Sequence, residues 1–126
     1  MSFCQIKTRL KFEIVGDNRF KLLEDFTFDN GERVFLIPSG FITDGFTIPP
    51  LFSPLQSHTG KGVEIAVVHD YCYSIYRPDD ITREEADLIF YNGLICLGMH
   101  PLKAKLMYLA VRLFGKTKWR KKKWMS

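Results

Sequence analysis

Hydrophobic and polar residues alternate along the first third of the chain with the period of two that is typical of β-strands. Residues 9–14 read Arg-Leu-Lys-Phe-Glu-Ile, and an apolar run over 33–37 is closed by Pro38. Residues 16–18 and 29–31 have the Gly, Asp and Asn content of tight turns. The pattern predicts an N-terminal antiparallel β-meander of about three or four strands.

The composition changes over residues 39–62, where Gly, Pro, Ser and Thr become frequent. Pro49, Pro50 and Pro54 exclude a long helix there. The segment also contains large apolar side chains, so we expect an ordered loop that packs onto the domain. The apolar residues in question are Phe41, Phe46, Ile48, Leu51 and Phe52.

From Val63 onward the apolar residues recur with helical spacing. The expected helices span about 61–76, 82–97 and 101–114. Strands followed by helices indicate an α+β domain rather than alternating βαβ units.

Several residues at the predicted helix ends are typical of caps. Thr82 and Glu85 fit a capping box, Gly98 fits a C-cap, and Pro101 suits the first turn of the third helix. These residues support the expected helix boundaries.

The expected third helix is apolar over a broad face, with Lys103, Lys105 and Arg112 on the other face. We interpret its apolar side chains as core residues. They are Leu102, Leu106, Met107, Tyr108, Leu109, Val111, Leu113 and Phe114.

The chain has 126 residues, of which 46% are hydrophobic, which is enough for one core. There is no apolar run long enough to span a membrane, and the first residues lack the basic and apolar regions of a signal peptide. These features predict a soluble intracellular protein.

Three cysteines, Cys4, Cys72 and Cys96, are an odd number at wide spacing. This spacing argues against a disulfide framework and matches no zinc motif. We expect three reduced, buried thiols.

The net charge of +4 is unevenly distributed. Residues 116–126 carry six Lys and Arg and no acidic residue, whereas residues 1–115 carry 12 basic and 14 acidic residues. We therefore divide the chain into a single domain, 1–115, and a basic tail, 116–126. Trp119 and Trp124 among these cations suit an anionic membrane surface, an acidic protein partner and, less well, nucleic acid, although a solvated tail explains them too.

The candidate chemistry lies on the first two expected helices. His69 and Asp70 are adjacent, and Asp87 is in line with apolar Phe90 and Tyr91, so its carboxylate points toward the core. A buried carboxylate needs a partner, and a hydrogen bond to His69 would satisfy both groups.

Such a pair suits the hydrolysis of an ester or amide. His69 oriented by Asp87 would take a proton from water, while Asp70 with Asp44 would hold a divalent cation, preferably Ca²⁺. Each residue also has a structural interpretation: His69 as a core histidine, Asp44 as an Asx-turn residue. Cys72 is a poor candidate nucleophile because no oxyanion-binding element accompanies it.

Four blocks of sequence resemble the phage and prophage family DUF1353, whose activity is not established. The blocks are Pro38-x-Gly40-Phe41-Ile42-Thr43-Asp44-Gly45-x-x-Ile48-Pro49, Ala66-Val67-Val68-His69-Asp70-Tyr71-x-Tyr73, Arg83-x-x-Ala86-Asp87-x-x-Phe90 and Met107-Tyr108-x-x-Val111-Arg112-x-x-Gly115. The resemblance implies a tailed-phage or prophage origin, so we expect the protein in the host bacterial cytoplasm or in a phage virion, with virion proteins as candidate partners of the tail. Thr43 and Arg83 lie within these blocks, and we assign them to the site as supporting residues.

A shorter resemblance connects His69-Asp70-x-Cys72-Tyr73 and Ala86-Asp87-x-x-Phe90 to the paired-helix active site of phospholipases A2. It implies His69 as base, Asp70 as calcium ligand, Asp87 as the residue that orients His69, and Tyr73 as its support. The glycine-rich calcium loop of those enzymes is absent, with Thr43-Asp44-Gly45 as the only substitute, and so are their flanking disulfide cysteines.

Three functions remain open on these grounds. The first is the metal-assisted hydrolase. The second is a phage virion-associated or assembly protein in which the same residues only stabilise the fold. The third is a host-directed effector that binds a protein or nucleotide through the aromatic loop or the tail.

Overall fold

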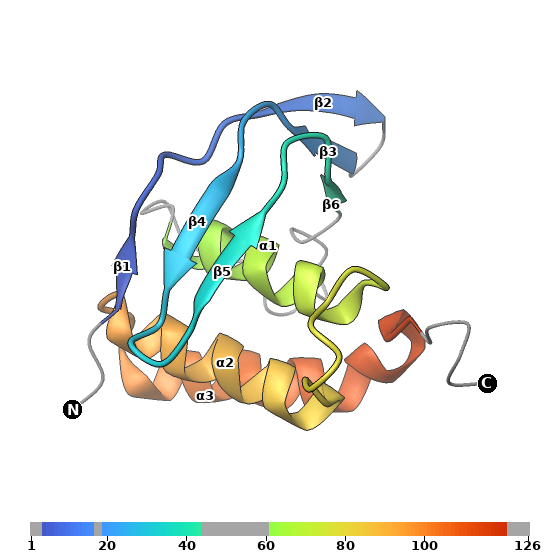
Figure 1. Cartoon of the computed structure of the whole chain (residues 1–126). Helices are drawn as coiled ribbons and strands as arrows, with labels where there is room; N and C mark the ends of the chain where they lie inside the picture. The colour runs from blue at the N-terminus through green and yellow to red at the C-terminus, as the bar shows by residue number, and fades with distance from the viewer. Residues whose placement is uncertain (1–3, 17–18, 44–60, 121–126) are drawn as a thin grey trace.

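The computed structural model describes residues 4–16, 19–43 and 61–120, with the backbone alone at 61–63. Two three-stranded antiparallel sheets come first along the chain, and three helices follow (Figure 1). This confirms the predicted α+β class. The meander differs from the prediction, since six strands in two sheets replace one sheet of three or four.

The first sheet has the order β1 (Gln5–Ile6), β4 (Phe26–Asp29), β5 (Val34–Ile37). β4 and β5 form the hairpin predicted from the turn at 29–31, where the Asp29 carboxylate accepts a 2.8 Å hydrogen bond from the Gly31 amide. Gly31 has a φ of 92°, which favours glycine.

The second sheet has the order β2 (Phe12–Gly16), β3 (Arg19–Leu22), β6 (Ile42–Thr43). β2 and β3 are the hairpin expected around residues 16–18. β6 begins the segment that was predicted to be a loop, and Phe41 just before it packs edge-on against Tyr71 at 5.6 Å. The rest of the predicted loop, with Asp44, lies outside the described residues.

The helices are α1 (Lys61–Tyr73), α2 (Arg83–Cys96) and α3 (Pro101–Phe114), followed by the 3-10 helix η2 (Gly115–Lys118). All three predicted helices are present. Figure 1 shows β4 and β5 in front of α1, with α2 and α3 side by side below them. Among the described residues no helix is long and apolar enough to cross a membrane.

The helix ends follow the expected caps. Thr82 Oγ1 accepts a 3.1 Å hydrogen bond from the Glu85 amide, and Gly98, with a φ of 103°, follows the last turn of α2. His100, for which the sequence suggested no role, caps α3 by accepting a 3.1 Å hydrogen bond from the Leu102 amide.

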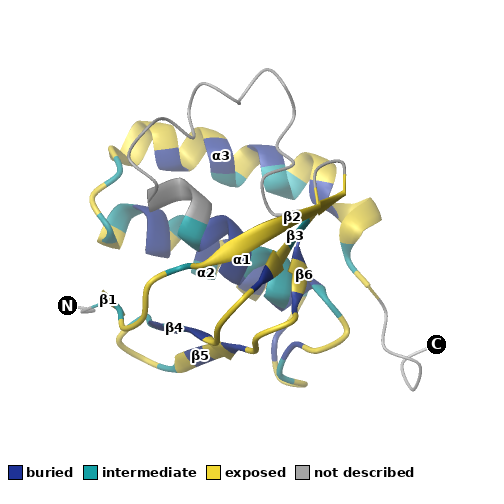
Figure 2. Ribbon diagram, turned by 90° about the horizontal axis from the view of Figure 1, so that it is seen from above, coloured by how far each residue is buried: buried dark blue, intermediate teal, exposed yellow. Residues whose placement is uncertain are grey.

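The core lies between the first sheet and the helices. Phenylalanines on the inner face of β4 and β5 are fully buried against apolar residues of α1 and α2, as the dark blue areas of Figure 2 show. Its largest fully buried members are Phe26, Phe28, Phe35, Phe90, Leu22, Ile37, Ile65, Leu94 and Met107.

The orientation of α3 corrects the sequence interpretation. The core side of α3 is formed by Ala104, Met107 and Ala110, all at most 1% exposed. The leucines assigned to the core are instead exposed. Small residues allow α3 to approach α2 closely, which explains why they, rather than the leucines, face inward.

The cysteines also differ from expectation. Cys4, beside β1, forms a disulfide with Cys96, the last residue of α2. The prediction of three reduced thiols was therefore wrong for this pair and right for Cys72, which is free and buried.

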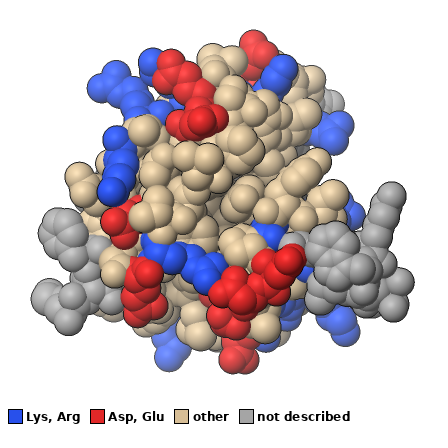
Figure 3. All heavy atoms as spheres, in the orientation of Figure 1, with Lys and Arg blue, Asp and Glu red and all other residues tan. Residues whose placement is uncertain are grey.

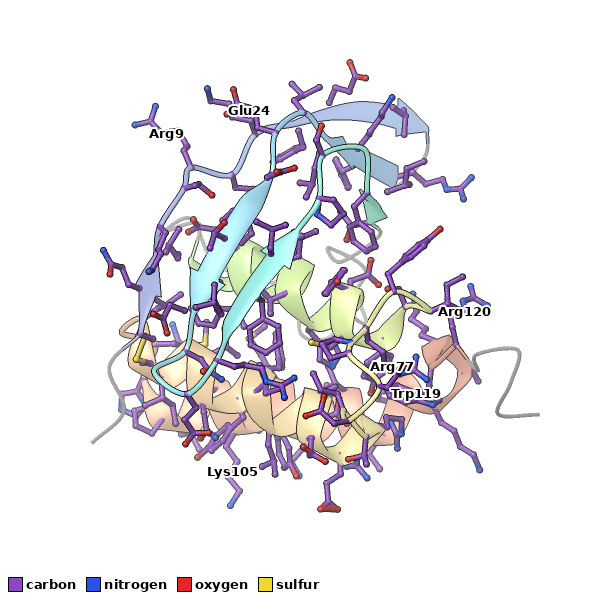
Figure 4. All side chains as sticks on the ribbon, viewed as in Figure 1. Arg9, Glu24, Arg77, Lys105, Trp119 and Arg120 are labelled. Atoms are coloured by element: carbon purple, nitrogen blue, oxygen red, sulfur yellow. A yellow bond between two sulfur atoms is a disulfide. The ribbon has the colours of Figure 1, made fainter. Side chains whose placement is uncertain are left out.

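The first residues of the predicted basic tail pack against the end of α1. Trp119 lies edge-on to Tyr73 at 5.3 Å and over the Arg77 guanidinium at 3.7 Å (Figure 4). The Arg120 amide donates to the Tyr73 carbonyl at 3.0 Å. Trp119 and the Arg120 backbone are thus held against the domain, whereas Lys116, Lys118 and Arg120 are exposed, and residues 121–126 lie outside the described part of the chain.

Candidate active site

Asp87 is the centre of the candidate site. It lies on the inner face of α2, and its side chain is 0% exposed. Its Oδ1 lies 2.7 Å from both His69 Nε2 and the Tyr73 hydroxyl. Its Oδ2 accepts a 2.7 Å hydrogen bond from Arg112 Nη1. Residues of all three helices therefore meet on one carboxylate.

Helical spacing explains how these side chains reach Asp87. His69 and Tyr73 are four residues apart, so they project from the same face of α1 toward α2. Arg83 is four residues before Asp87 on α2, and its Nη1 lies 3.7 Å from Asp87 Oδ2. The site is therefore built from one turn of α1, one turn of α2 and the end of α3.

Arg83 ties the site to the last turn of α3. It donates hydrogen bonds to the carbonyls of Val111 at 3.3 Å and Arg112 at 3.2 Å. A cation at a helix C-terminus is stabilised by the carbonyls that have no partner within the helix.

The electrostatics favour an ionised Asp87. Burial alone would raise its pKa, but the hydrogen bonds from His69, Tyr73 and Arg112 outweigh it and lower the pKa below the usual value. Arg83 and Arg112 lie 3.7 Å and 2.7 Å from Asp87 Oδ2, and they compensate the charge of this carboxylate.

Tyr73 has its proton directed at Asp87. Burial and the hydrogen bond to Asp87 raise the pKa of Tyr73, which keeps the phenol protonated. Its oxygen accepts a 3.1 Å hydrogen bond from Arg83 Nη1. A Cβ at Gly115 would lie 2.6 Å from this oxygen, so only glycine fits beside it.

His69 is held in one orientation by its neighbours. Its ring lies 4.3 Å from the Tyr73 ring and 4.8 Å from the Phe90 ring, and its side chain is 13% exposed. Because an ionised carboxylate only accepts, Nε2 carries the proton, and the neutral ring has its lone pair on Nδ1. Nδ1 has no hydrogen-bond partner among the described residues.

A cleft of about 960 Å³ adjoins the site. Asp70 and Tyr73 of α1 line it, together with Phe41 and Thr43 of the strand segment and Arg120 of the C-terminal segment. His69 is not among the lining residues, but the residue after it and the tyrosine against its ring are.

The structure brings four of the predicted site residues together: His69, Asp87, Tyr73 and Arg83. Asp70 and Thr43 line the adjoining cleft, as Tyr73 does. Asp44 lies outside the described residues.

Sequence analysis missed Arg112 and Gly115 as members of the site, although both fall in the last block that resembles a known family. Arg112 was assigned to the solvent-facing side of the third helix. A signal was present in the expected burial of Asp87, because a buried carboxylate needs a positively charged partner.

Cys72 lies on α1 but has the properties of a core residue. Burial raises the pKa of its thiol to about 12, so the nucleophilic thiolate is not populated at neutral pH. A cysteine nucleophile is thus disfavoured.

The chain is similar to two curated proteins of Sinorhizobium fredii, both named as uncharacterized. One, y4iH, is 37% identical over 76 residues, which cover 58% of this chain and 30% of the relative. The other, y4jT, is 35% identical over 101 residues, which cover 76% of this chain and 29% of the relative. The chain thus spans less than a third of either relative, and no solved structure gives a significant match.

A family model matches residues 20–111, which include every described residue of the site except Arg112 and Gly115. The chain therefore belongs to the family described as "Protein of unknown function (DUF1353)".

Proposed function

We propose that this protein is a hydrolase of ester or amide bonds in which His69 is the general base. The observation that carries the proposal is the 2.7 Å contact of His69 Nε2 with the buried Asp87, which leaves the basic lone pair on Nδ1. A neutral imidazole in a fixed orientation is the usual group for removing a proton from water near pH 7.

The reaction follows from this arrangement. A water molecule at Nδ1 loses a proton to the imidazole as its oxygen forms a bond to the substrate carbonyl carbon. Asp87 stabilises the imidazolium through Nε2. The imidazolium then gives the proton to the leaving oxygen or nitrogen as the bond from that atom to carbon breaks.

The cleft beside His69 has the size of a small-molecule site, which is about 300–1,000 Å³. Among the described residues, Arg19, Lys118 and Arg120 line it together with one carboxylate, that of Asp70. Three cations in the wall suit a carbonyl that gains negative charge as it is attacked.

The described residues alone do not make up a calcium site. Calcium takes about six to eight oxygen ligands, and the described residues contain no group of three His, Cys, Asp or Glu able to hold a metal ion. Asp44 is the only further acid in the segment 44–60. We therefore derive no step through a metal ion, and a cation held by Asp70 and Asp44 remains a separate proposal.

His69→Gln is the variant that tests the proposal. The glutamine amide can donate to Asp87 as Nε2 does, but it has no basic nitrogen. Against a panel of p-nitrophenyl esters and acylated amides, we expect kcat/KM to fall about 100-fold or more while Tm stays close to that of the parent. Activity that survives His69→Gln would exclude His69 as the base.

The tautomer can be checked without a substrate. A long-range ¹⁵N–¹H NMR spectrum of the protein near pH 7 should show His69 with a proton on Nε2 and no proton on Nδ1. The opposite tautomer would contradict the proposed chemistry.

A structural protein is the second candidate, and one observation favours it. Asp87 receives hydrogen bonds from α1 and α3, so the cluster also acts as a clamp between the helices. A virion-associated or assembly protein of phage origin would use the clamp for stability alone. In that case His69→Gln changes neither Tm nor any hydrolytic rate.

A further inference from the structure

The outer face of α3 carries a stripe of exposed leucines. Leu102, Leu106, Leu109 and Leu113 follow each other at intervals of four, three and four residues, so they lie in one line along the helix. They are between 38% and 75% exposed, and Phe114 beside the end of the stripe is 56% exposed. The buried residues of α3 lie on its other side.

A row of this kind is unusual on the free surface of a small protein. Apolar side chains scattered singly are normal, but a contiguous apolar surface marks an interaction site. From Leu102 to Leu113 the stripe covers twelve residues, and its two ends lie about 17 Å apart along the helix. The charged side chains around the stripe indicate what covers it.

The charged residues that flank the stripe are lysines. Lys103 and Lys105 are exposed and lie on opposite sides of the stripe, each about 100° from the neighbouring leucine around the helix. Figure 4 shows Lys105 pointing away from the body of the molecule. Lys116, just beyond the stripe, is exposed as well.

Acidic and basic residues are also unevenly distributed along the whole sequence. All 14 acidic residues occur at or before Asp87, and the part of the sequence after Asp87 contains nine Lys and Arg and no acid. In contrast, the face that carries β4, β5 and α2 has acidic and basic side chains interspersed (Figure 3). The apolar stripe thus lies in the last 39 residues of the sequence, which contain basic residues and no acidic ones.

The exposed leucines and the positive charge around them together indicate which partner covers the stripe. A second copy of this chain would bring two cationic helices face to face, and a neutral apolar partner would leave the lysines without counter-charges. An anionic lipid surface accepts both, since acyl chains take up leucines and headgroups attract lysines. We infer that α3 docks this protein onto an anionic bilayer through Leu102, Leu106, Leu109 and Leu113.

This surface differs from the tail suggested by the sequence. Trp119 is already engaged by Tyr73 and Arg77, and Arg112 is engaged by Asp87. Neither Trp119 nor Arg112 belongs to the leucine stripe. The inference is also independent of the proposed hydrolysis, because it concerns binding alone.

The test is binding of the full chain to vesicles of phosphatidylglycerol and phosphatidylcholine, measured by co-sedimentation. We expect binding to the mixed vesicles, little binding to pure phosphatidylcholine, and weakening as NaCl rises from about 0.05 to about 0.5 M. Leu113→Glu should weaken binding at least about tenfold, because it removes an apolar contact and adds a repelled charge.

Ile14→Glu is the matched control. Ile14 on β2 and Leu113 on α3 are each 75% exposed, so both substitutions put a carboxylate on the surface in place of an apolar side chain. Ile14→Glu should leave vesicle binding within about twofold of the parent. Circular dichroism confirms that both variants are folded.

Three results would overturn the inference. One is the absence of binding to the anionic vesicles, and another is equal loss of binding in the two variants. The third is a dimer of the parent chain, seen by light scattering, that Leu113→Glu converts to a monomer, because a second copy would then be the occupant of the stripe.

Discussion

Arg112 of α3 donates a 2.7 Å hydrogen bond to the Asp87 oxygen that His69 and Tyr73 leave unused. The hydrogen bond to Asp87 raises the pKa of Arg112, so the guanidinium stays charged. The buried carboxylate of α2 is thereby neutralised from the C-terminal helix, which makes α3 part of the candidate site as well as of the fold.

We expect Arg112→Leu to lower the free energy of unfolding by about 2–4 kcal/mol, because it leaves a buried carboxylate short of positive charge. Arg83 lies at 3.7 Å and compensates in part. The measurement is urea unfolding followed by circular dichroism. Lys105→Leu changes the same charge on the exposed side of α3 and should stay within about 0.5 kcal/mol of the parent. Equal effects of the two substitutions would mean that the contact with Asp87 contributes no stability.

The lowered pKa of Asp87 predicts how stability depends on pH. The folded state binds the proton less tightly than the unfolded state, whose pKa is near 3.9. The contribution of Asp87 is therefore complete above that pH and is lost as the pH falls through the folded pKa.

Asp87→Asn isolates this contribution. Other carboxylates titrate in both proteins and cancel in the difference between their free energies of unfolding. We expect that difference to be constant from pH 7 to about pH 5 and to shrink below about pH 4, by at most about 1.4 kcal/mol per pH unit. A difference that does not change at acid pH would contradict an ionised, stabilising Asp87.

The His69–Asp87 pair could be predicted because both residues sit next to apolar positions on consecutive helices, and short-range helical geometry places them on facing sides. Arg112 could not be predicted in the same way. α3 has apolar residues on both faces, and a helical pattern alone does not say which face is inside. The choice depends on Ala104 and Ala110, whose small size allows close packing on α2.

Long-range pairing limited the prediction of the fold. Each hairpin followed from local turn residues such as Gly31. The pairing of β1 with β4 and of β6 with β3, which divides the strands into two sheets, joins segments whose contact leaves no local signal. The disulfide was missed for the same reason, because Cys4 and Cys96 are 92 residues apart.

The disulfide can be tested by counting thiols. Titration of the denatured, unreduced protein should find one free thiol, that of Cys72, and three after reduction. Because the bridge closes a long loop, reduction should lower the free energy of unfolding by about 2–4 kcal/mol. Such bridges persist in oxidising compartments, so the protein should be prepared without reductant.

Cys96→Ser supplies the control for this experiment. In this variant, reductant should have no further effect on the free energy of unfolding, since the bridge is already absent. Three free thiols in the unreduced parent would instead restore the expectation of reduced cysteines.

Trp119 should hold the C-terminal segment against the domain. Its ring lies over Arg77, a buried residue whose Nη1 donates to the carbonyls of Ser74 at 2.8 Å and Arg120 at 2.7 Å. Burial lowers the pKa of Arg77, and the ring and these carbonyls compensate the buried charge. We expect Trp119→Ala to cost about 1–3 kcal/mol of unfolding free energy, measured by urea unfolding.

Tyr76→Ala is the matched control. It removes an aromatic ring that is 65% exposed, and it should cost less than about 0.5 kcal/mol. If both substitutions cost the same, the docking of Trp119 on Arg77 adds nothing to the fold, and the segment after η2 is held by the Arg120 backbone contacts instead.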